Sequence, residues 1–213
     1  MTLTRTAMLL GITLALAACG REEAPVADAS PAPAPTAEPA PAEPAPVATQ
    51  LAASARATLA AVGESGVSGE LVFDIADGGV RVTGTLAGLQ PGATHALHVH
   101  EFGDCSAPDA TSAGGHFNPG QQPHGDRAAG GAHHAGDIPN QTAGDNGEAA
   151  VDQALAGLEI ASGGANDIVG KGVIVHAQAD DYTTQPTGDA GGRIACGVIE
   201  LGNAPPTGSD PAQ

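Results

Sequence analysis

The residues of this chain most able to do chemistry are its histidines, seven of which lie from His98 onward. A single valine separates His98 from His100, so on a β-strand both imidazoles point to the same face. Two histidines placed in this way are a common means of binding a metal ion, although a solvent-facing polar stripe has the same pattern. His176 ends the apolar run 173–175, where a lone histidine is more often structural.

A second group of histidines lies in the glycine-rich segment 111–146, which has almost no hydrophobic periodicity and is expected to be a long loop. The segment carries His116, His124, His133, His134 and Asp137. Imidazoles together with one carboxylate suit a four-coordinate zinc site. Ligation would also order so long a loop, because binding energy becomes folding energy. A solvated, histidine-rich loop is the alternative.

Alternating apolar and polar residues indicate the strands that would position these groups. A hairpin with one apolar face is predicted from Leu71, Phe73, Ile75, Val80 and Val82, with a turn at Asp77-Gly78. Alternation at 97–100, 173–176 and 194–198 predicts further strands. Since no long 3.6-residue period occurs, the predicted fold class is all-β, either a sandwich or a barrel.

The N-terminus predicts export and lipid attachment. Arg5 precedes the apolar run 7–18, which is too short to span a membrane. The run ends in Leu16-Ala17-Ala18-Cys19, which resembles a bacterial lipobox, whose cysteine becomes the lipidated first residue. Ordinary cleavage with an incidental Cys19 is the alternative. We therefore expect a signal peptide over 1–18 and a lipid-anchored protein on the periplasmic side or at the surface of a bacterium.

Low-complexity segments flank the predicted domain, which spans residues 51–202. Residues 19–50 are rich in Ala and Pro, a composition typical of a polyproline-II tether. Residues 203–213 are polar and are expected to be a disordered tail. The formal net charge of −17 argues against nucleic acid as a partner, because phosphates would be repelled.

Five sequence strings stand in a fixed order between residues 57 and 201. They are His98-Val99-His100-Glu101-Phe102-Gly103-Asp104, Gly115-His116-Phe117-Asn118-Pro119, His134-Ala135-Gly136-Asp137, Gly172-Val173-Ile174-Val175-His176 with Ala179-Asp180-Asp181, and Gly192-Arg193-Ile194-Ala195-Cys196-Gly197-Val198-Ile199. Together they resemble the motifs of the copper/zinc superoxide dismutase family. That family is itself a standard example of the β-sandwich. The resemblance implies a Greek-key sandwich or flattened barrel of Ig-like architecture, with long metal-binding and electrostatic loops.

The resemblance also implies a two-metal site and an activity. Copper would be bound by His98, His100, His116 and His176, and zinc by His116, His124, His134 and Asp137. His116 would bridge the two metals, and Asp180 would link a copper ligand to a zinc ligand. Arg193 would attract superoxide beside the copper. The implied reaction converts two superoxide anions and two protons to hydrogen peroxide and oxygen, with His116 and Arg193 as catalytic residues.

Three features bear on this implied site. His133 precedes His134 and could compete for zinc, although the spacing to Asp137 favours His134. The resemblance pairs Cys105 with Cys196 in a disulfide, with two buried free thiols as the alternative. Between residues 177 and 192 the chain has acidic residues and no lysine, so the strength of electrostatic steering stays open.

Two other functions remain to be weighed. The first is an extracytoplasmic copper-binding or copper-delivery protein on the same scaffold, which would be expected to lack some copper ligands. The second is an adhesive sandwich lipoprotein, which would need no constellation of histidines. The full set of four candidate copper ligands, together with Arg193, favours the enzyme. A homodimer is among the assemblies that the sequence leaves open.

Overall fold

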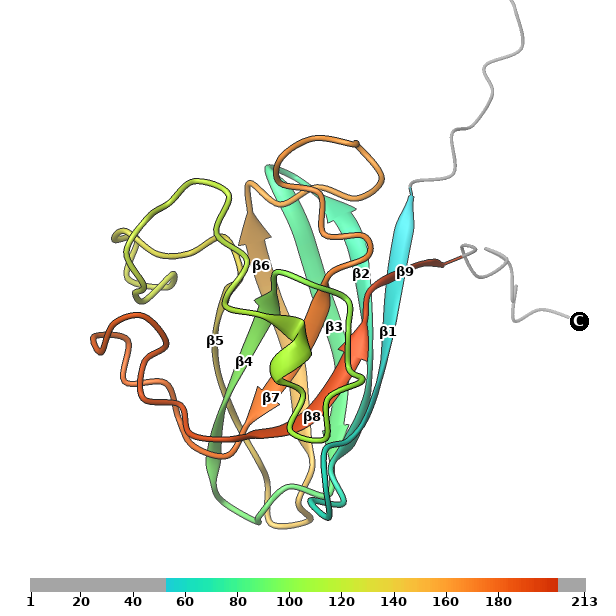
Figure 1. Ribbon diagram of the computed structural model, residues 1–213, viewed down its shortest axis with the longest axis vertical. Coiled ribbons are helices and arrows are strands. Elements are labelled where there is room, and N and C mark those ends of the chain that lie inside the picture. Colours follow the sequence, from blue (N-terminus) through green and yellow to red (C-terminus); the bar gives the residue numbers. More distant parts are fainter. Residues whose placement is uncertain (1–52, 203–213) are drawn as a thin grey trace, which may run out of the picture. The chain divides into compact units, whose positions relative to one another are not determined.

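The computed structural model describes residues 53–202, which form nine β-strands and one short 3-10 helix (Figure 1). The elements are β1 (Ser54–Ala61), β2 (Ser68–Ala76), β3 (Gly79–Ala87), β4 (Thr94–His100), η1 (Thr111–Ala113), β5 (Asp137–Thr142), β6 (Ala149–Ala156), β7 (Gly172–His176), β8 (Arg193–Val198) and β9 (Glu200–Gly202). Within this part of the chain no helix is long and apolar enough to cross a membrane. The predicted signal peptide, Cys19, the tether and the tail lie outside the described residues.

The strands pair antiparallel in the order β5-β4-β7-β8-β1-β2-β3-β6, and β9 adds to β1. The strands form two halves, one containing β2, β3, β6 and β9 and the other containing β4, β5, β7 and β8, and β1 pairs with strands of both. Its residues 54–59 pair with β2, whereas Ala60 and Ala61 pair with β8. The end strands β5 and β6 also contact each other, so the sheet nearly closes. Non-sequential neighbours such as β3 and β6 or β4 and β7 are the crossovers of a Greek key. The predicted all-β sandwich or flattened barrel is confirmed.

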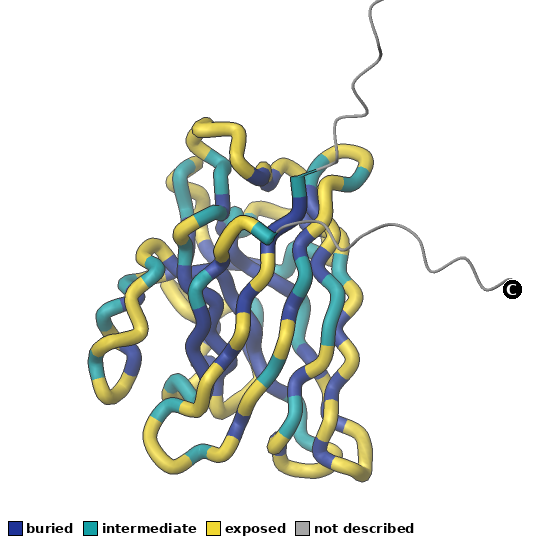
Figure 2. Tube along the Cα trace, turned by 90° about the vertical axis from the view of Figure 1, so that its right-hand side faces the viewer, coloured by how far each residue is buried: buried dark blue, intermediate teal, exposed yellow. Residues whose placement is uncertain are grey.

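The core is made mostly of valine, leucine, isoleucine and alanine side chains. The buried residues that contribute them are the dark segments of the trace in Figure 2. The predicted β2–β3 hairpin is present, with Phe73 opposite Val82 and the turn at Asp77-Gly78. The buried apolar face of this hairpin is shorter than the sequence predicted. Leu71, Phe73, Val80 and Val82 are buried, but Ile75 is 52% exposed, because it lies near the end of the strand, next to the turn.

The lack of periodicity in the segment 111–146 predicted one long loop, and this prediction was wrong. The segment contains η1 and the strand β5, which pairs with β4 through Leu97 opposite Ile138 and His98 opposite Asp137. The strand gave a weak signal because Ile138 is its only large apolar residue and Pro139 follows. An edge strand tolerates proline, since its outer N–H groups need no partner in the sheet. The strands β1 and β6 are alanine-rich, and alanine has little strand propensity.

A disulfide joins Cys105, in the segment before η1, to Cys196 on β8. The two cysteines are 91 residues apart, and their Cα atoms lie 5.9 Å from each other. The predicted pairing is therefore present in the structure. It ties the loop that carries η1 to the sheet through Cys196, which is buried beside Ala110, Ala113 and Ile174.

Replacing Cys105 and Cys196 together by serine should lower the free energy of unfolding by about 4–5 kcal/mol, because a cross-link that closes about 90 residues restricts the unfolded chain. Urea unfolding of the metal-free protein would measure the change. Reducing the disulfide of the parent protein is the matched control and should produce a similar loss. An unchanged unfolding midpoint in both samples would contradict the prediction.

Candidate metal centre

Four buried histidines converge beside the paired strands β4 and β7. Within the described residues, His98, His100, His116 and His176 each offer a ring nitrogen, and these nitrogens all lie within 4.8 Å of one another. We call these residues the first metal group. The alternation of β4 buries Leu97 and Val99 in the main core, so His98 and His100 point to the opposite face. The Nε2 atoms of His100 and His176 are 3.4 Å apart.

His116 reaches this group through main-chain contacts that attach its loop to β4. His116 forms an isolated bridge with His100, and the Phe117 N–H donates to the Val99 carbonyl at 2.8 Å. Gly136 completes the arrangement, because its carbonyl accepts from the Val99 N–H and its own N–H donates to Phe117. A Cβ at position 136 would lie 2.2 Å from the Val99 oxygen, so only glycine fits.

A second metal group consists of His116, His124, His134 and Asp137, whose potential ligand atoms also lie within 4.8 Å of one another. Asp137 begins β5, and its Oδ1 is 2.8 Å from His116 Nδ1. Its Oδ2 accepts from the main-chain N–H groups of His134, at 2.8 Å, and Gly125, at 3.2 Å. These two bonds hold the carboxylate toward the three rings.

His133 belongs to neither group. Its half-buried ring turns away, and its Nδ1 donates to the Gly131 carbonyl at 2.7 Å. Its neighbour His134 is buried and converges with Asp137. Of the two adjacent imidazoles that the sequence offered, the structure therefore brings His134 to the site.

Asp180 lies between the two groups and contacts both. Its Oδ2 accepts from His98 Nε2 and its Oδ1 from His124 Nε2, each at 2.8 Å. These contacts fix the tautomer of each ring and leave Nδ1 of His98 and of His124 facing its metal group. The carboxylate is itself held in place, because Asn140 exchanges two 2.8 Å hydrogen bonds with the main chain of Asp180 and the Tyr182 N–H donates to Oδ1.

Asn140 and His95 were missed by the sequence analysis. Asn140 lies on the weakly patterned strand β5, and no local signal marks its contact with a loop 40 residues away. His95 is buried on β4, and its Nδ1 donates to the His176 carbonyl at 2.9 Å. It supports the main chain of a first-group residue, and its single ring on an apolar strand resembles that of any core histidine.

Arg193 begins β8 and is half-buried beside the first group. Its guanidinium donates to the carbonyls of Ala110 and Gly114, and the distance to Gly114 is 2.6 Å. His100 Nδ1 donates to the same Gly114 oxygen at 3.0 Å, so the cation and the imidazole share an acceptor. This places the one positive charge contributed by β8 next to the four histidines.

Burial sets the protonation of the first group. Removal from water lowers the pKa of His100 to about 2, of His176 to about 3 and of His116 to about 4, and repulsion between neighbouring rings adds to the shift. All three imidazoles are therefore neutral at pH 7. Neutral imidazole is the form that binds a metal ion, because its lone pair is free.

The second group is arranged around ionised carboxylates. Burial disfavours charge on His124, but Asp137 and Asp180 outweigh it and raise the pKa of His124 to about 9. Burial also opposes charge on Asp137, yet its interactions with His116, His124 and His134 hold the pKa of that carboxyl well below its usual range. At pH 7 the ionised Asp137 therefore faces a protonated His124, which has to lose its proton before its ring can bind a metal ion.

The ring nitrogens themselves indicate that metal ions fit. Across the described residues, four buried ring nitrogens of the two groups make no hydrogen bond: Nδ1 of His98, Nε2 of His116, Nδ1 of His124 and Nδ1 of His134. Nδ1 of His124 lies 3.1 Å from Asp137 Oδ2 but is not aligned for a hydrogen bond. Burying such atoms unpartnered is costly. Three rings with one carboxylate suit zinc, and imidazole rings suit copper as well.

Residues 67–199 match the model of the family described as copper/zinc superoxide dismutase (SODC). The chain belongs to the copper/zinc superoxide dismutase family. Solved structures agree with this assignment. A SOD-like protein from Bacillus subtilis is 36% identical, with a TM-score of 0.61 over 67% of this chain and 96% of that one. Its double variant, in which a tyrosine and a proline are replaced by histidine, is 37% identical, with a TM-score of 0.62 over 68% and 96%.

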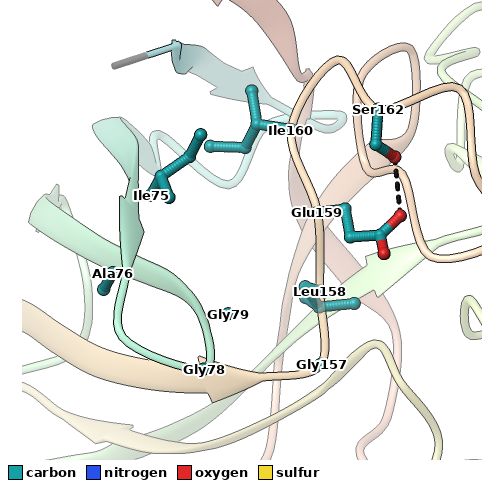
Figure 3. A pocket seen from close by; sticks show the side chains of 9 residues that line it. All are labelled: Ile75, Ala76, Gly78, Gly79, Gly157, Leu158, Glu159, Ile160 and Ser162. Atoms are coloured by element: carbon teal, nitrogen blue, oxygen red, sulfur yellow. Dashed lines mark hydrogen bonds between the residues drawn. The ribbon is translucent and has the colours of Figure 1, made fainter.

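A separate surface hollow of about 390 Å³ lies beside the β2–β3 turn (Figure 3). Ile75 and Ile160 face it from two sides, and its polar side chains, Glu159 and Ser162, bond to each other at 2.6 Å. None of the residues of either metal group lines it. This hollow is therefore separate from the candidate metal centre.

The metal-free protein should be most stable near pH 6.5. Unfolded histidine protonates at about pH 6.5, whereas folded His100, His116 and His176 stay neutral to much lower pH, so acid favours the unfolded state. His124 acts in the opposite sense. Its pKa of about 9 contributes stability below about pH 6.5, and this contribution is lost as the pH rises toward 9.

Urea unfolding of chelator-treated protein between about pH 4 and 9 would measure this profile. The variant His133→Ala is a suitable control and should leave the profile unchanged, because that ring lies outside both groups. A stability that stays flat from neutral to alkaline pH would contradict the role given to His124.

Proposed function

We propose that the protein is a superoxide dismutase, with copper in the first metal group and zinc in the second. The observation that carries this proposal is the position of His116, whose Nδ1 faces Asp137 and whose Nε2 faces the first group without a hydrogen-bond partner among the described residues. One imidazole shared by two ligand sets suits a pair of metal ions with different tasks.

The side chains define what the site can do with a small anion. Copper, when bound, would accept and return one electron, and zinc would contribute charge without redox chemistry. Nδ1 of His116 is directed at Asp137 and the second group, so Nε2 is the atom at which this ring can hold and release a proton. Reduction of superoxide to hydrogen peroxide consumes protons, and His116 Nε2 is placed to supply one.

Arg193 would attract and orient the anionic substrate. A chain with a net charge of −17 repels superoxide at long range, so binding depends on a local positive potential. Superoxide dismutases are a standard example of such steering. The guanidinium is partly exposed, and it is held near His100 by the shared Gly114 carbonyl.

We further propose that the enzyme acts outside the cytoplasm, attached to a membrane through lipid on Cys19. The lipobox-like sequence that ends at Cys19 supports this location. The Cys105–Cys196 disulfide also supports it, because structural disulfides persist in oxidising compartments.

A copper-binding or copper-delivery function is the second candidate. It is supported by the similar structures from Bacillus subtilis, because those proteins are described as SOD-like and not as superoxide dismutases. The dismutase is preferred because all four histidines of the first group converge and Arg193 lies beside them. Both functions require metal binding, and only the first requires rapid consumption of superoxide.

Protein loaded with copper and zinc should consume superoxide rapidly, and His116→Ala should sharply reduce the rate, because it removes a ligand from both groups. The control is His133→Ala, which removes a half-buried ring from the same loop and should leave the rate unchanged. Metal content measured on each sample separates the outcomes. A parent protein that binds both metals but is inert would favour the copper-binding function.

Arg193→Ala should lower the rate constant for superoxide and weaken its dependence on ionic strength, because the local charge is lost. Metal content should not change, since Arg193 is in neither metal group. Arg193→Lys keeps the charge but loses the paired hydrogen bonds to the carbonyls of Ala110 and Gly114. This variant should retain most of the ionic-strength dependence. An unaltered rate in Arg193→Ala would refute the assigned role.

A further inference from the structure

Arg127 makes an unusual set of contacts beneath the second metal group. Its Nε donates to the Asp137 carbonyl at 2.7 Å, and its Nη2 donates to the Ala135 carbonyl and, at 3.4 Å, to that of His134. Its Nη1 donates to the Ala156 carbonyl at 3.1 Å. One guanidinium therefore gathers carbonyls from the loop end 134–137 and from the last residue of β6.

These contacts bear directly on the metal group, because two of the carbonyls belong to His134 and Asp137. The loop between His124 and His134 is rich in glycine and alanine, so it has few side chains that could fix its path. Arg127 is held within this loop by the same four carbonyls and thereby joins the loop to β6. The position of the His134 ring relative to the Asp137 carboxylate depends on this attachment.

We propose that Arg127 is a positioning residue for the second metal group, which it holds in a binding-competent arrangement before a metal ion arrives. This inference rests on the proposed binding of zinc by that group. Arg127 touches neither a ring nitrogen nor a carboxylate oxygen of the group and acts through the main chain of His134 and Asp137.

The charge of Arg127 and its positioning role predict opposite changes in zinc affinity when the side chain is removed. A guanidinium near a site for a divalent cation repels that cation, so its removal would strengthen binding if electrostatics were its only effect. Burial from water also opposes its positive charge. A cation is nevertheless suited to this position, because only the planar arginine fork offers five N–H donors to several carbonyls at once. We expect the geometric effect to exceed the repulsion.

The experiment compares zinc affinity in Arg127→Gln and Arg127→Lys with the parent, by titrating the metal-free, disulfide-bonded protein with zinc against a competing chelator. Both variants should bind zinc about 10–100-fold more weakly, as is usual when groups that orient metal ligands are lost. Lysine should not rescue binding, because it keeps the charge but not the fork. Lysine also keeps most of the aliphatic part of the arginine side chain, so Arg127→Lys is expected to fold even if Arg127→Gln does not.

A matched control is Arg81→Gln. Arg81 also binds to β6, through two hydrogen bonds to Asp152, but both side chains are more than half exposed and neither belongs to a metal group. Its loss should leave zinc affinity unchanged. Cobalt bound in place of zinc provides a second readout, since its visible absorption reports ligand geometry. That spectrum should change in both Arg127 variants and not in Arg81→Gln.

Zinc binding by Arg127→Gln that is as tight as in the parent, or tighter, with the same cobalt spectrum, would overturn the inference. A parent protein that takes up no zinc would instead contradict the proposed function, and the inference would fall with it. Weaker binding in Arg127→Gln that Arg127→Lys fully restores would also overturn it, because a single ammonium group would then suffice and the several carbonyl contacts of the guanidinium would not be needed.

Discussion

Imidazole nitrogens buried away from water need a partner, and this requirement determines how the site is built. Each ring of the two groups directs a nitrogen at the centre of its group, and His116 directs one at each centre. In most of the other rings the second nitrogen is fixed by Asp180 or by a carbonyl such as that of Gly114. Among the described residues, four of the central nitrogens make no hydrogen bond, and Nε2 of His100 and Nε2 of His176 lie 3.4 Å from each other. Bound metal ions would resolve this conflict, and their binding energy would then become part of the energy of the fold.

The two groups are supported in different ways. The first lies mainly on β4 and β7, where paired strands and a packed core beneath Val99 and Val175 hold His98, His100 and His176. The second lies mainly on a loop with almost no core of its own. There the polar contacts of Arg127, Asp180 and Asp137 replace hydrophobic packing, and the Cys105–Cys196 disulfide fixes the neighbouring loop.

The sequence predicted the fold class, and its resemblance to the family implied all seven residues of the two metal groups. It also favoured His134 over His133, and the geometry agrees. It could not predict β5, whose polar residues follow no alternation, or the exposure of Ile75. Arg127, His95 and Asn140 escaped notice because their importance depends on carbonyls and carboxylates that only tertiary folding brings near.

Asp180 touches both groups, so the two metal groups share one support. Its Oδ2 orients His98, and its Oδ1 orients His124. This carboxylate is held by Asn140 and by the Tyr182 N–H, which belong to neither group. A displacement of the segment 180–182 would therefore turn one ring in each group at the same time. Damage to this segment would impair both metal groups together.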